Sequence, residues 1–318
     1  MSSQPPVPAA VTDAAARAAP ARGKHRSLEA SSARFAYYML TPALLCMALV
    51  AFYPMVNTVA TSFTDSTFGQ NTTSFVGLDN YTKLVQDPAF RTSIWTSVRF
   101  TVITVVFEFL FGLIIALVVN SAFRGRGVVR ASMLIPWALI TVISAAMWKL
   151  MYNQIYGVFN DLLVTKLHVL AANVDWLGSP ATALPAVAAI DIWKTTPFIA
   201  LLLLAGLQLI PGDVYEAADV DGAGKIRTFF SITLPLLMPS ILVAVVIRAL
   251  DALRVFDLFY VLFGQRPDTT TMSIYVQEQI IYFGKVGYGS AVSVALLLII
   301  AVFIAIYVVM TRWSAARS

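Results

Sequence analysis

The chain has 318 residues, of which 58% are hydrophobic and only 12% are charged, and its mean hydropathy is +0.77. This composition excludes an ordinary soluble domain, in which about 25% of the residues are charged. The net charge of +5 does not predict a nucleic-acid partner, because the basic residues are scattered between apolar segments and form no stripe. We therefore expect an all-α membrane protein that works in a lipid bilayer.

The first 34 residues are rich in Ala, Pro, Ser and Arg and show no hydrophobic period. This composition predicts a disordered cytosolic N-terminal tail over residues 1–34. A signal peptide is not expected, because the first apolar stretch is long and no small-residue cleavage site follows it. Cys46 is the only cysteine, which excludes an intramolecular disulfide and any multi-cysteine metal site.

Six segments are long and apolar enough to cross a membrane, for which a helix needs about 20 predominantly apolar residues. They are Phe35–Phe63, Ile94–Val119, Val128–Tyr152, Leu184–Ile210, Leu236–Val255 and Tyr288–Met310. The prediction is a six-helix transmembrane domain over residues 35–312, followed by a short cytosolic tail over 313–318. Prolines within or beside the segments predict kinks, at Pro42, Pro54, Pro136, Pro197 and Pro239.

The distribution of basic residues predicts the orientation of the chain. With a cytosolic N-terminus, the cytosolic side holds Arg17, Arg22, Lys24, Arg26, Arg34, Arg124, Arg126, Arg130, Lys225, Arg227, Arg312 and Arg317. The other side holds only Lys83, Arg91, Lys166, Arg266 and Lys285. This bias follows the positive-inside rule and predicts cytosolic N- and C-termini and a cytosolic loop over 211–235.

Ionisable residues lie inside the predicted spans, where each charge costs about 2.5–3.5 kcal/mol at mid-bilayer by the lower estimates. Asp191 and Lys194 share one helical face of the fourth span, and Arg248 and Asp251 share one face of the fifth. The two pairs could neutralise each other. Glu108 is the only carboxylate in the second span, which indicates a bond to a neighbouring helix.

A second interpretation of the same charges is a sugar site. Trp137, Trp193 and Thr195 lie near the charged pairs and add aromatic faces and a hydroxyl group. Sugar hydroxyls pair with carboxylates and guanidinium groups, and the C–H face of a sugar packs on an aromatic ring. The sequence leaves both interpretations open.

A polar loop interrupts the apolar chain with the sequence EAADVDGAGKIRTFFSITLP. Gly222 predicts a sharp reversal of the backbone, and Asp219 or Asp221 is placed to bond the loop to itself or to a basic patch on a partner. The spacing from Glu216 through Gly222 to Leu234-Pro235 resembles the cytoplasmic coupling loop of ATP-binding-cassette (ABC) importer permeases. An ordinary cytoplasmic turn is the alternative.

The wider chain resembles the carbohydrate-importer permeases of the maltose and glycerol-phosphate type. The resemblance is carried by LIPWALI, DIWKTTPF, AGLQLIP and RALDALRVFDLFYVLF. It implies the type I (MetI-like) ABC importer permease fold and transport of a sugar, with trehalose suggested by the likeness to actinobacterial trehalose importers. It also implies substrate-binding residues at Trp137, Asp191, Trp193, Lys194, Thr195, Arg248, Asp251, Ala252 and Val255, and ATPase-coupling residues at Glu216, Ala217, Ala218, Asp219, Asp221 and Gly222.

The resemblance implies a bacterial plasma (inner) membrane location and several partners. These are a second homologous permease subunit, two ATPase subunits, an extracytoplasmic sugar-binding protein or lipoprotein, and the sugar. No cofactor is expected in this chain, because the segment 222–226 lacks the glycine spacing and the hydroxyl of a phosphate-binding loop, so the ATPase subunits would bind ATP and magnesium.

The chain departs from the maltose-type pattern in two places. Several of the implied substrate-binding positions hold charged residues. This predicts that the sugar differs from maltose or is held in a different pose. The segment Gly264-Gln265-Arg266 replaces the glycine-rich turn that the family has before Pro267, which puts loop contacts with the receptor in question.

The alternatives are an ion-coupled transporter, an enzyme, and an importer with a different cargo. An ion-coupled secondary transporter would also have buried charges, but it would not need a coupling loop. An enzyme is not expected, because there is no nucleophile elbow, His-rich metal cluster or carboxylate pair at catalytic spacing. Glycerol phosphate is the alternative cargo, for which Lys194 and Arg248 would pair with the phosphate group.

Overall fold

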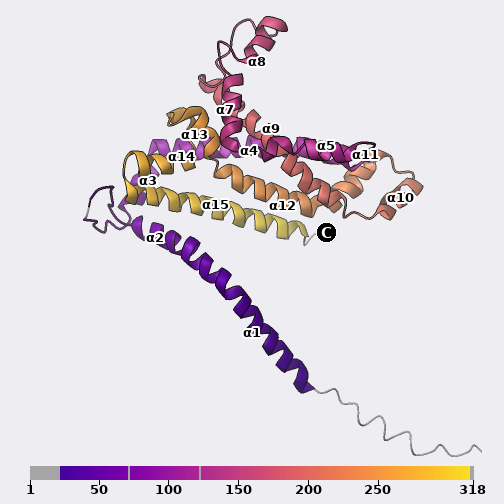
Figure 1. Cartoon of the computed structure of the whole chain (residues 1–318), viewed down its shortest axis with the longest axis horizontal. Coiled ribbons are helices and arrows are strands. Elements are labelled where there is room, and N and C mark those ends of the chain that lie inside the picture. The colour runs from indigo at the N-terminus through magenta and orange to yellow at the C-terminus, as the bar shows by residue number, and fades with distance from the viewer. Residues whose placement is uncertain (1–21, 71, 122, 316–318) are drawn as a thin grey trace, which may run out of the picture. The chain divides into compact units, whose positions relative to one another are not determined.

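The computed structural model describes residues 22–70, 72–121 and 123–315, which form helices joined by loops (Figure 1). The chain divides into two compact units, Met1–Asn57 and Thr58–Ser318. Within the described ranges there is no β-strand, only one isolated antiparallel bridge between Thr64 and Phe75. The predicted all-α fold is confirmed.

The first unit consists of α1 (Arg22–Met47), a π-helical turn (Ala48–Phe52) and the start of α2 (Tyr53–Thr61). Helix α1 takes in residues 22–34, which corrects the expectation of a disordered tail over 1–34 for that part. Residues 24–34 contain no proline and are rich in Ala, Arg, Lys, Glu and Leu, which favour helix. Residues 1–21 lie outside the described part.

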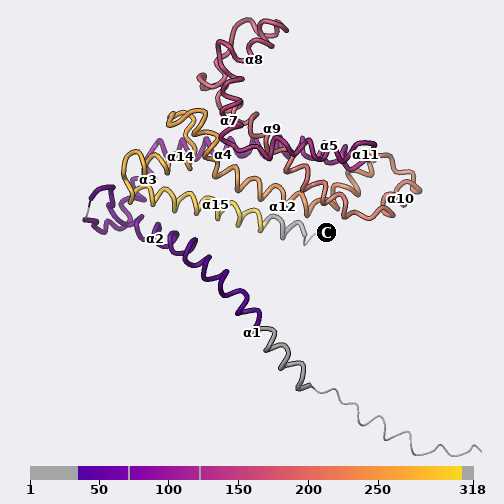
Figure 2. Tube along the Cα trace, in the orientation of Figure 1, coloured from indigo at the N-terminus to yellow at the C-terminus, as the bar shows by residue number. Residues whose placement is uncertain are grey.

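Four long helices run side by side in the second unit (Figure 2), and α12 contacts each of the other three. They are α4 (Pro88–Asn120), α9 (Pro180–Leu207), α12 (Leu234–Leu253) and α15 (Val286–Ala315). Helix α15 continues past the predicted domain boundary at residue 312, and residues 316–318 lie outside the described part.

Shorter helices connect the long ones. They are α3 (Asp79–Gln86), α5 (Arg126–Ser132), α6 (Ile135–Ala138), α7 (Thr141–Met151), α8 (Val158–Asn160), α10 (Gly212–Val220), α11 (Lys225–Thr228), α13 (Asp257–Phe263) and α14 (Met272–Gln277). π-helical turns cover Asp161–Lys166, Phe229–Thr233 and Glu278–Tyr282, and a 3-10 turn covers Pro267–Thr269. Figure 1 places α10 and α11 at one end of the long helices and α3 and α14 at the other.

Five helical stretches of the described chain are long and apolar enough to span a membrane: Phe35–Thr61, Pro88–Asn120, Pro180–Leu207, Lys225–Phe263 and Val286–Val309. The remaining predicted span, Val128–Tyr152, is broken. Its two parts, Arg126–Ala138 and Thr141–Met151, are bent by 87°. The predicted six spans are present only if this bent pair counts as one.

The bend falls after Pro136, not at it. Pro136 lies in the first turn of α6, where its missing N–H is not needed. Leu139 and Ile140 have extended backbones, with ψ angles of 138° and 132°, and these two residues interrupt the helical hydrogen bonds. The sequence has no proline or glycine at the break, which is why the segment was predicted as one helix.

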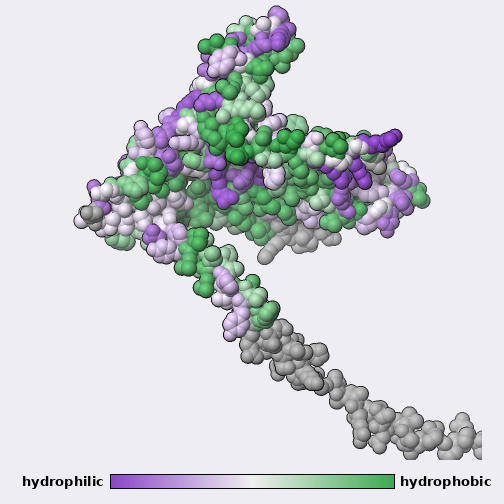
Figure 3. Space-filling model, in the orientation of Figure 1, coloured by the Kyte–Doolittle hydropathy of each residue, from purple (hydrophilic) through white to green (hydrophobic). Residues whose placement is uncertain are grey.

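The long helices approach closely because small residues lie at their contacts. A Cβ atom added at Gly112 of α4 would lie 2.8 Å from the Cγ2 atom of Ile199 on α9, which leaves room only for glycine. A buried apolar cluster on α4, α9 and α12 contains Ala116, Leu203 and Leu237. Hydrophobic side chains also cover much of the outer surface of these helices, whereas hydrophilic ones gather near α10 and α11 (Figure 3). This arrangement suits a bundle surrounded by lipid.

Candidate functional site

A buried ionic cluster joins three of the long helices. The Arg248 side chain on α12 is only 4% exposed, and the Glu108 side chain on α4 is fully buried. The Arg248 guanidinium donates from Nε to Glu108 Oε2 at 2.5 Å and from Nη2 to Glu108 Oε1 at 3.0 Å. It also donates to Asp191 on α9, and from Nη1 to Asp251 Oδ2 at 3.1 Å. One guanidinium is thus held by three carboxylates, the most strongly by the bidentate pair with Glu108.

The cluster tests what the sequence predicted about charge pairing. Glu108 does bond a neighbouring helix, and Arg248 does pair with Asp251, so both expectations are confirmed. The two predicted pairs also neutralise each other, because Asp191 of α9 pairs with Arg248 across the α9–α12 contact. Among the described residues no ion pair joins Asp191 to Lys194. The sequence did not show that Glu108 and Asp191 share one arginine.

The nine predicted substrate-binding residues differ in exposure. Asp191, Thr195, Arg248 and Ala252 are buried; Trp193, Lys194 and Val255 are half-buried; Trp137 and Asp251 are exposed. A sugar can therefore reach the Asp251 carboxylate, which is 70% exposed, more readily than the guanidinium behind it. Ala252 packs in an apolar cluster and offers no surface in this conformation.

The two predicted aromatic residues pack on other aromatic rings. Trp137 on α6 stacks on Phe198 of α9, with ring centroids 5.5 Å apart and planes 10° from parallel. Trp193 contacts Trp148 of α7 edge-on at 5.4 Å. Thr195 lies within reach of the cluster, since its hydroxyl donates to Asp191 Oδ1 at 3.5 Å. The structure thus brings the predicted charges together and leaves the two tryptophans on separate contacts.

Glu108 is the residue that the predicted site omitted. Its sequence signal was a lone carboxylate in an apolar segment, which must find a partner inside the protein. Sequence spacing could not name that partner, because Arg248 lies 140 positions away.

The predicted coupling loop begins with helix α10, Gly212–Val220, which contains Glu216, Ala217, Ala218 and Asp219. Gly222 follows the helix with φ +72°, which confirms the predicted reversal. The Gly222 N–H donates to Asp219 O at 3.1 Å, and the Ala223 N–H donates to Ala218 O at 2.9 Å. This is the Schellman pattern of helix termination, which favours glycine at the left-handed position.

One side of α10 is anchored and the rest is open. Ala218 is buried, and the Tyr215 hydroxyl lies 3.2 Å from the Thr233 hydroxyl in the turn that leads into α12. Glu216, Ala217, Asp219, Asp221 and Gly222 are exposed. Val220 is also 89% exposed. A short, rigidly terminated helix with acidic and apolar groups facing outward offers a surface for a partner protein.

Residues 108–318 match the model of a protein family described as the binding-protein-dependent transport system inner membrane component. The chain belongs to this family. Its members are permeases of ABC importers, which are non-catalytic membrane subunits. This identity rules out the ion-coupled and enzymatic alternatives and confirms the predicted permease fold.

Three relatives of this permease are named as permeases of carbohydrate transport systems. It is 43% identical to the trehalose/maltose transport system permease protein MalF of Thermococcus litoralis, covering 90% of this chain and 96% of that protein. It is 40% identical to the sulfoquinovosyl glycerol permease SmoG of Agrobacterium fabrum, over 90% and 93% of the two chains. It is 35% identical to the trehalose permease SugA of Mycobacterium tuberculosis, over 86% and 88%.

A solved structure shares the fold of this permease. It is the bacterial alginate ABC transporter in complex with an alginate pentasaccharide-bound periplasmic protein. The matched chain superimposes with a TM-score of 0.77 at 24% identity, and the match covers 89% of this chain and 96% of that one.

Proposed function

We propose that this permease moves a neutral disaccharide, such as trehalose, from an extracytoplasmic binding protein into the cytosol. The names of two relatives, the trehalose/maltose permease and the trehalose permease, support a disaccharide cargo. The observation that carries the proposal for a neutral cargo is the state of Arg248, whose guanidinium is already engaged by carboxylates from three helices.

The charge balance of the ionic cluster disfavours an anionic cargo. Glu108, Asp191 and Asp251 surround one guanidinium, so the carboxylates outnumber it and no full positive charge is left for a phosphate or a sulfonate. Lys194 alone would be a weak anchor. Sugar hydroxyls, in contrast, both donate and accept, so they can donate to the exposed Asp251 carboxylate. The cluster therefore favours a sugar over glycerol phosphate.

The exposed surface of α10 supports the coupling role of Glu216 and its neighbours. In the proposed assembly two ATPase subunits bind ATP and magnesium, and a second homologous permease completes the pathway. Closure of the ATPases would move α10 as a rigid body, and the Tyr215–Thr233 contact would carry that movement towards α12 and Arg248. The binding protein would meet the opposite end, with both termini of this chain cytosolic.

Transport by the reconstituted importer tests the cargo. The complete complex, in vesicles with its binding protein, is expected to take up radiolabelled trehalose only when ATP is supplied. Unlabelled trehalose or maltose should compete, and glycerol 3-phosphate should not. Competition by glycerol 3-phosphate would overturn the neutral cargo, and uptake without ATPase subunits would overturn the assembly.

A paired substitution separates sugar binding from structural pairing. Asp251→Ala should lower uptake at least about tenfold while the ATPases still co-purify, because its carboxylate is exposed and offers a hydrogen bond to the sugar. Asp191→Ala should lower uptake as well. Retained assembly in Asp191→Ala would support a role in sugar binding, and lost assembly would assign this residue to structure alone.

A further inference from the structure

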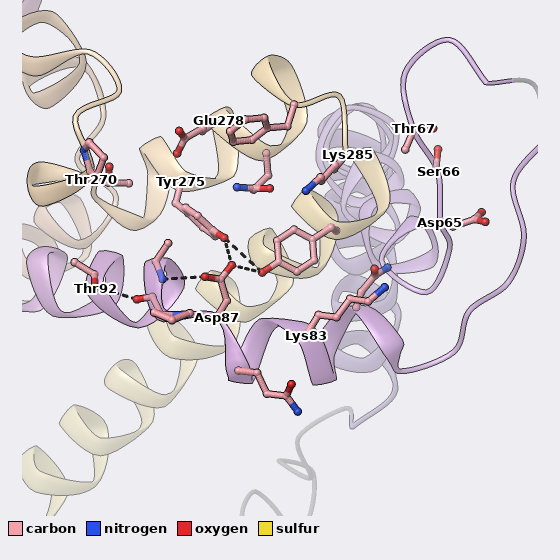
Figure 4. Close-up of a pocket in the computed structure, with 18 of the residues that line it drawn as sticks. Asp65, Ser66, Thr67, Lys83, Asp87, Thr92, Thr270, Tyr275, Glu278 and Lys285 are labelled. Atoms are coloured by element: carbon pink, nitrogen blue, oxygen red, sulfur yellow. Dashed lines mark hydrogen bonds between the residues drawn. The ribbon is translucent and has the colours of Figure 1, made fainter.

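A large cavity with many polar residues in its wall opens at the end of the second unit that lies opposite α10. It has a volume of about 1180 Å³ and is enclosed by α3, the start of α4, α14, the turn Glu278–Tyr282, the start of α15 and the loop at residues 65–67. Figure 4 shows Asp87 and Tyr275 meeting in its middle, with Asp65, Ser66 and Thr67 on one side and Thr270 on the other. None of the residues that line it belongs to the predicted intramembrane sugar site.

One part of the wall is a closed hydrogen-bond network. Asp87 caps α4 by accepting from the Ala89 N–H at 2.8 Å, and it also accepts from the hydroxyls of Tyr275 and Tyr288, the latter at 2.8 Å. Burial alone would raise the pKa of Asp87, but these hydrogen bonds together lower it. Asp87 is thus a satisfied scaffold residue, and it fixes two aromatic rings at the cavity wall.

Other groups on the wall have no partner. Gln279 is 6% exposed, yet no hydrogen bond reaches its side-chain amide among the described residues. Glu278 is half-buried, and within the same described ranges its carboxylate has neither an ion pair nor a hydrogen bond. The Thr67 hydroxyl is buried and unpaired within the described structure. Of these three groups only the Thr67 hydroxyl is a buried atom, and buried polar atoms normally have partners. The Gln279 amide and the Glu278 carboxylate remain accessible from the cavity and are free to bind a ligand.

We propose that this cavity is a second carbohydrate subsite, outside the membrane, which the sugar occupies before it enters the pathway. The wall offers an amide, a carboxylate and the Lys285 ammonium, which makes a cation–π contact 5.6 Å from the Phe283 ring centroid. These groups donate and accept hydrogen bonds, as the hydroxyls of a sugar require. The aromatic rings of Tyr275 and Phe283 match the C–H faces of a sugar. This inference rests on the proposed sugar cargo.

The size and the charge of the cavity favour a sugar over an ion. Its volume of about 1180 Å³ lies just above the range of about 300–1,000 Å³ for small-molecule sites, so a disaccharide fits and a single ion would not fill it. Carboxylates and ammonium groups both line it, so neither a simple anion nor a simple cation is preferred. A segment of a partner protein is the competing occupant, and the experiment distinguishes it.

Sugar binding to the complete importer, in nanodiscs and without the binding protein, tests the inference. Equilibrium dialysis with radiolabelled trehalose should show two sugars per permease in the wild type and one in Asp251→Ala. Adding Lys285→Gln or Gln279→Leu to Asp251→Ala should weaken the remaining binding about tenfold, since the first replaces the ammonium by a shorter neutral amide and the second removes an amide from the cavity. Gln277→Leu is the matched control, because Gln277 precedes the same turn and does not line the cavity.

The outcomes separate this inference from the proposed function. Uptake of sugar by the wild type, combined with no sugar bound by Asp251→Ala, would overturn the second subsite and leave the transport function intact. Lys285→Gln could instead leave sugar binding unchanged and abolish crosslinking of the binding protein to the permease. That result would show that the cavity holds a polypeptide. No sugar uptake by the wild type would overturn the proposed function itself.

Discussion

Helix α10, the proposed coupling helix, and the ionic cluster are built in opposite ways. Helix α10 and its terminating glycine lie within residues 212–222, and their hydrogen bonds link residues three to five positions apart. The ionic cluster links Arg248 to partners 57 and 140 positions away. The first is exposed and the second is buried. A local motif can therefore present a surface on its own, whereas the cluster exists only when three helices have packed.

The largest expected effect is the loss of transport when the exposed surface of α10 is changed. Glu216→Lys should abolish sugar uptake, because it reverses a charge on the surface proposed to meet the ATPase. The permease should remain folded and inserted, since Lys is a good helix former and Glu216 is exposed. Two measurements check this prediction: sugar uptake into vesicles that contain the variant importer, and membrane insertion of the variant permease. Normal transport by the variant would count against the coupling role of α10.

The largest expected effect on stability is in the buried cluster. Glu108→Ala should reduce the free energy of unfolding by about 3–5 kcal/mol, because it leaves the buried Arg248 guanidinium without its bidentate partner. Titrating the purified permease from mild detergent into SDS, with helicity as the readout, measures the change.

Asp251→Asn is the matched control for Glu108→Ala, because it removes the charge of the exposed partner of the same arginine. It should change stability by less than about 1 kcal/mol, as for exposed ion pairs. Equal losses in the two variants would contradict the assignment of Glu108 as the main support of Arg248.

A smaller effect is expected at the end of α10. Gly222→Ala should destabilise the local turn by about 1 kcal/mol, because φ +72° is unfavourable for a residue with a Cβ atom. No other atom lies within 4 Å of the added Cβ position, so the penalty is conformational. Hydrogen exchange at Ala223 should accelerate several-fold, and Gly224→Ala, which has an ordinary φ angle and open space, is the control. An unchanged exchange rate in Gly222→Ala would contradict the turn.

The smallest effect is the pH dependence of the stability that Asp87 contributes. The pKa of Asp87 is lowered in the folded protein, so its contribution to stability is present above the usual carboxyl value and is lost as the pH falls through the lowered pKa. Proteolysis of residues 264–288 should therefore be constant near neutral pH and accelerate below about pH 4. Asp87→Asn should remove this acid-dependent step. A variant with the same pH profile as the wild type would show that another group is responsible.

Much of the fold follows from local patterns. Long apolar segments dictate spanning helices, because backbone groups in lipid must bond within the segment. The Gly222 reversal follows from the residue type alone. The break at Leu139 and Ile140 does not, because neither residue disfavours helix and no proline or glycine marks the place.

The sequence by itself determined that this protein spans a membrane, that it carries a loop resembling the coupling loop of ABC importer permeases, and that its intramembrane charges must find partners. Each of these depends on composition or on residues close together in the chain. Only the tertiary structure decided which partners the charges take, how deeply Arg248 is buried, and that residues between 65 and 288 line a common cavity. Those features arise from packing between distant segments, where many alternative pairings satisfy the same local pattern.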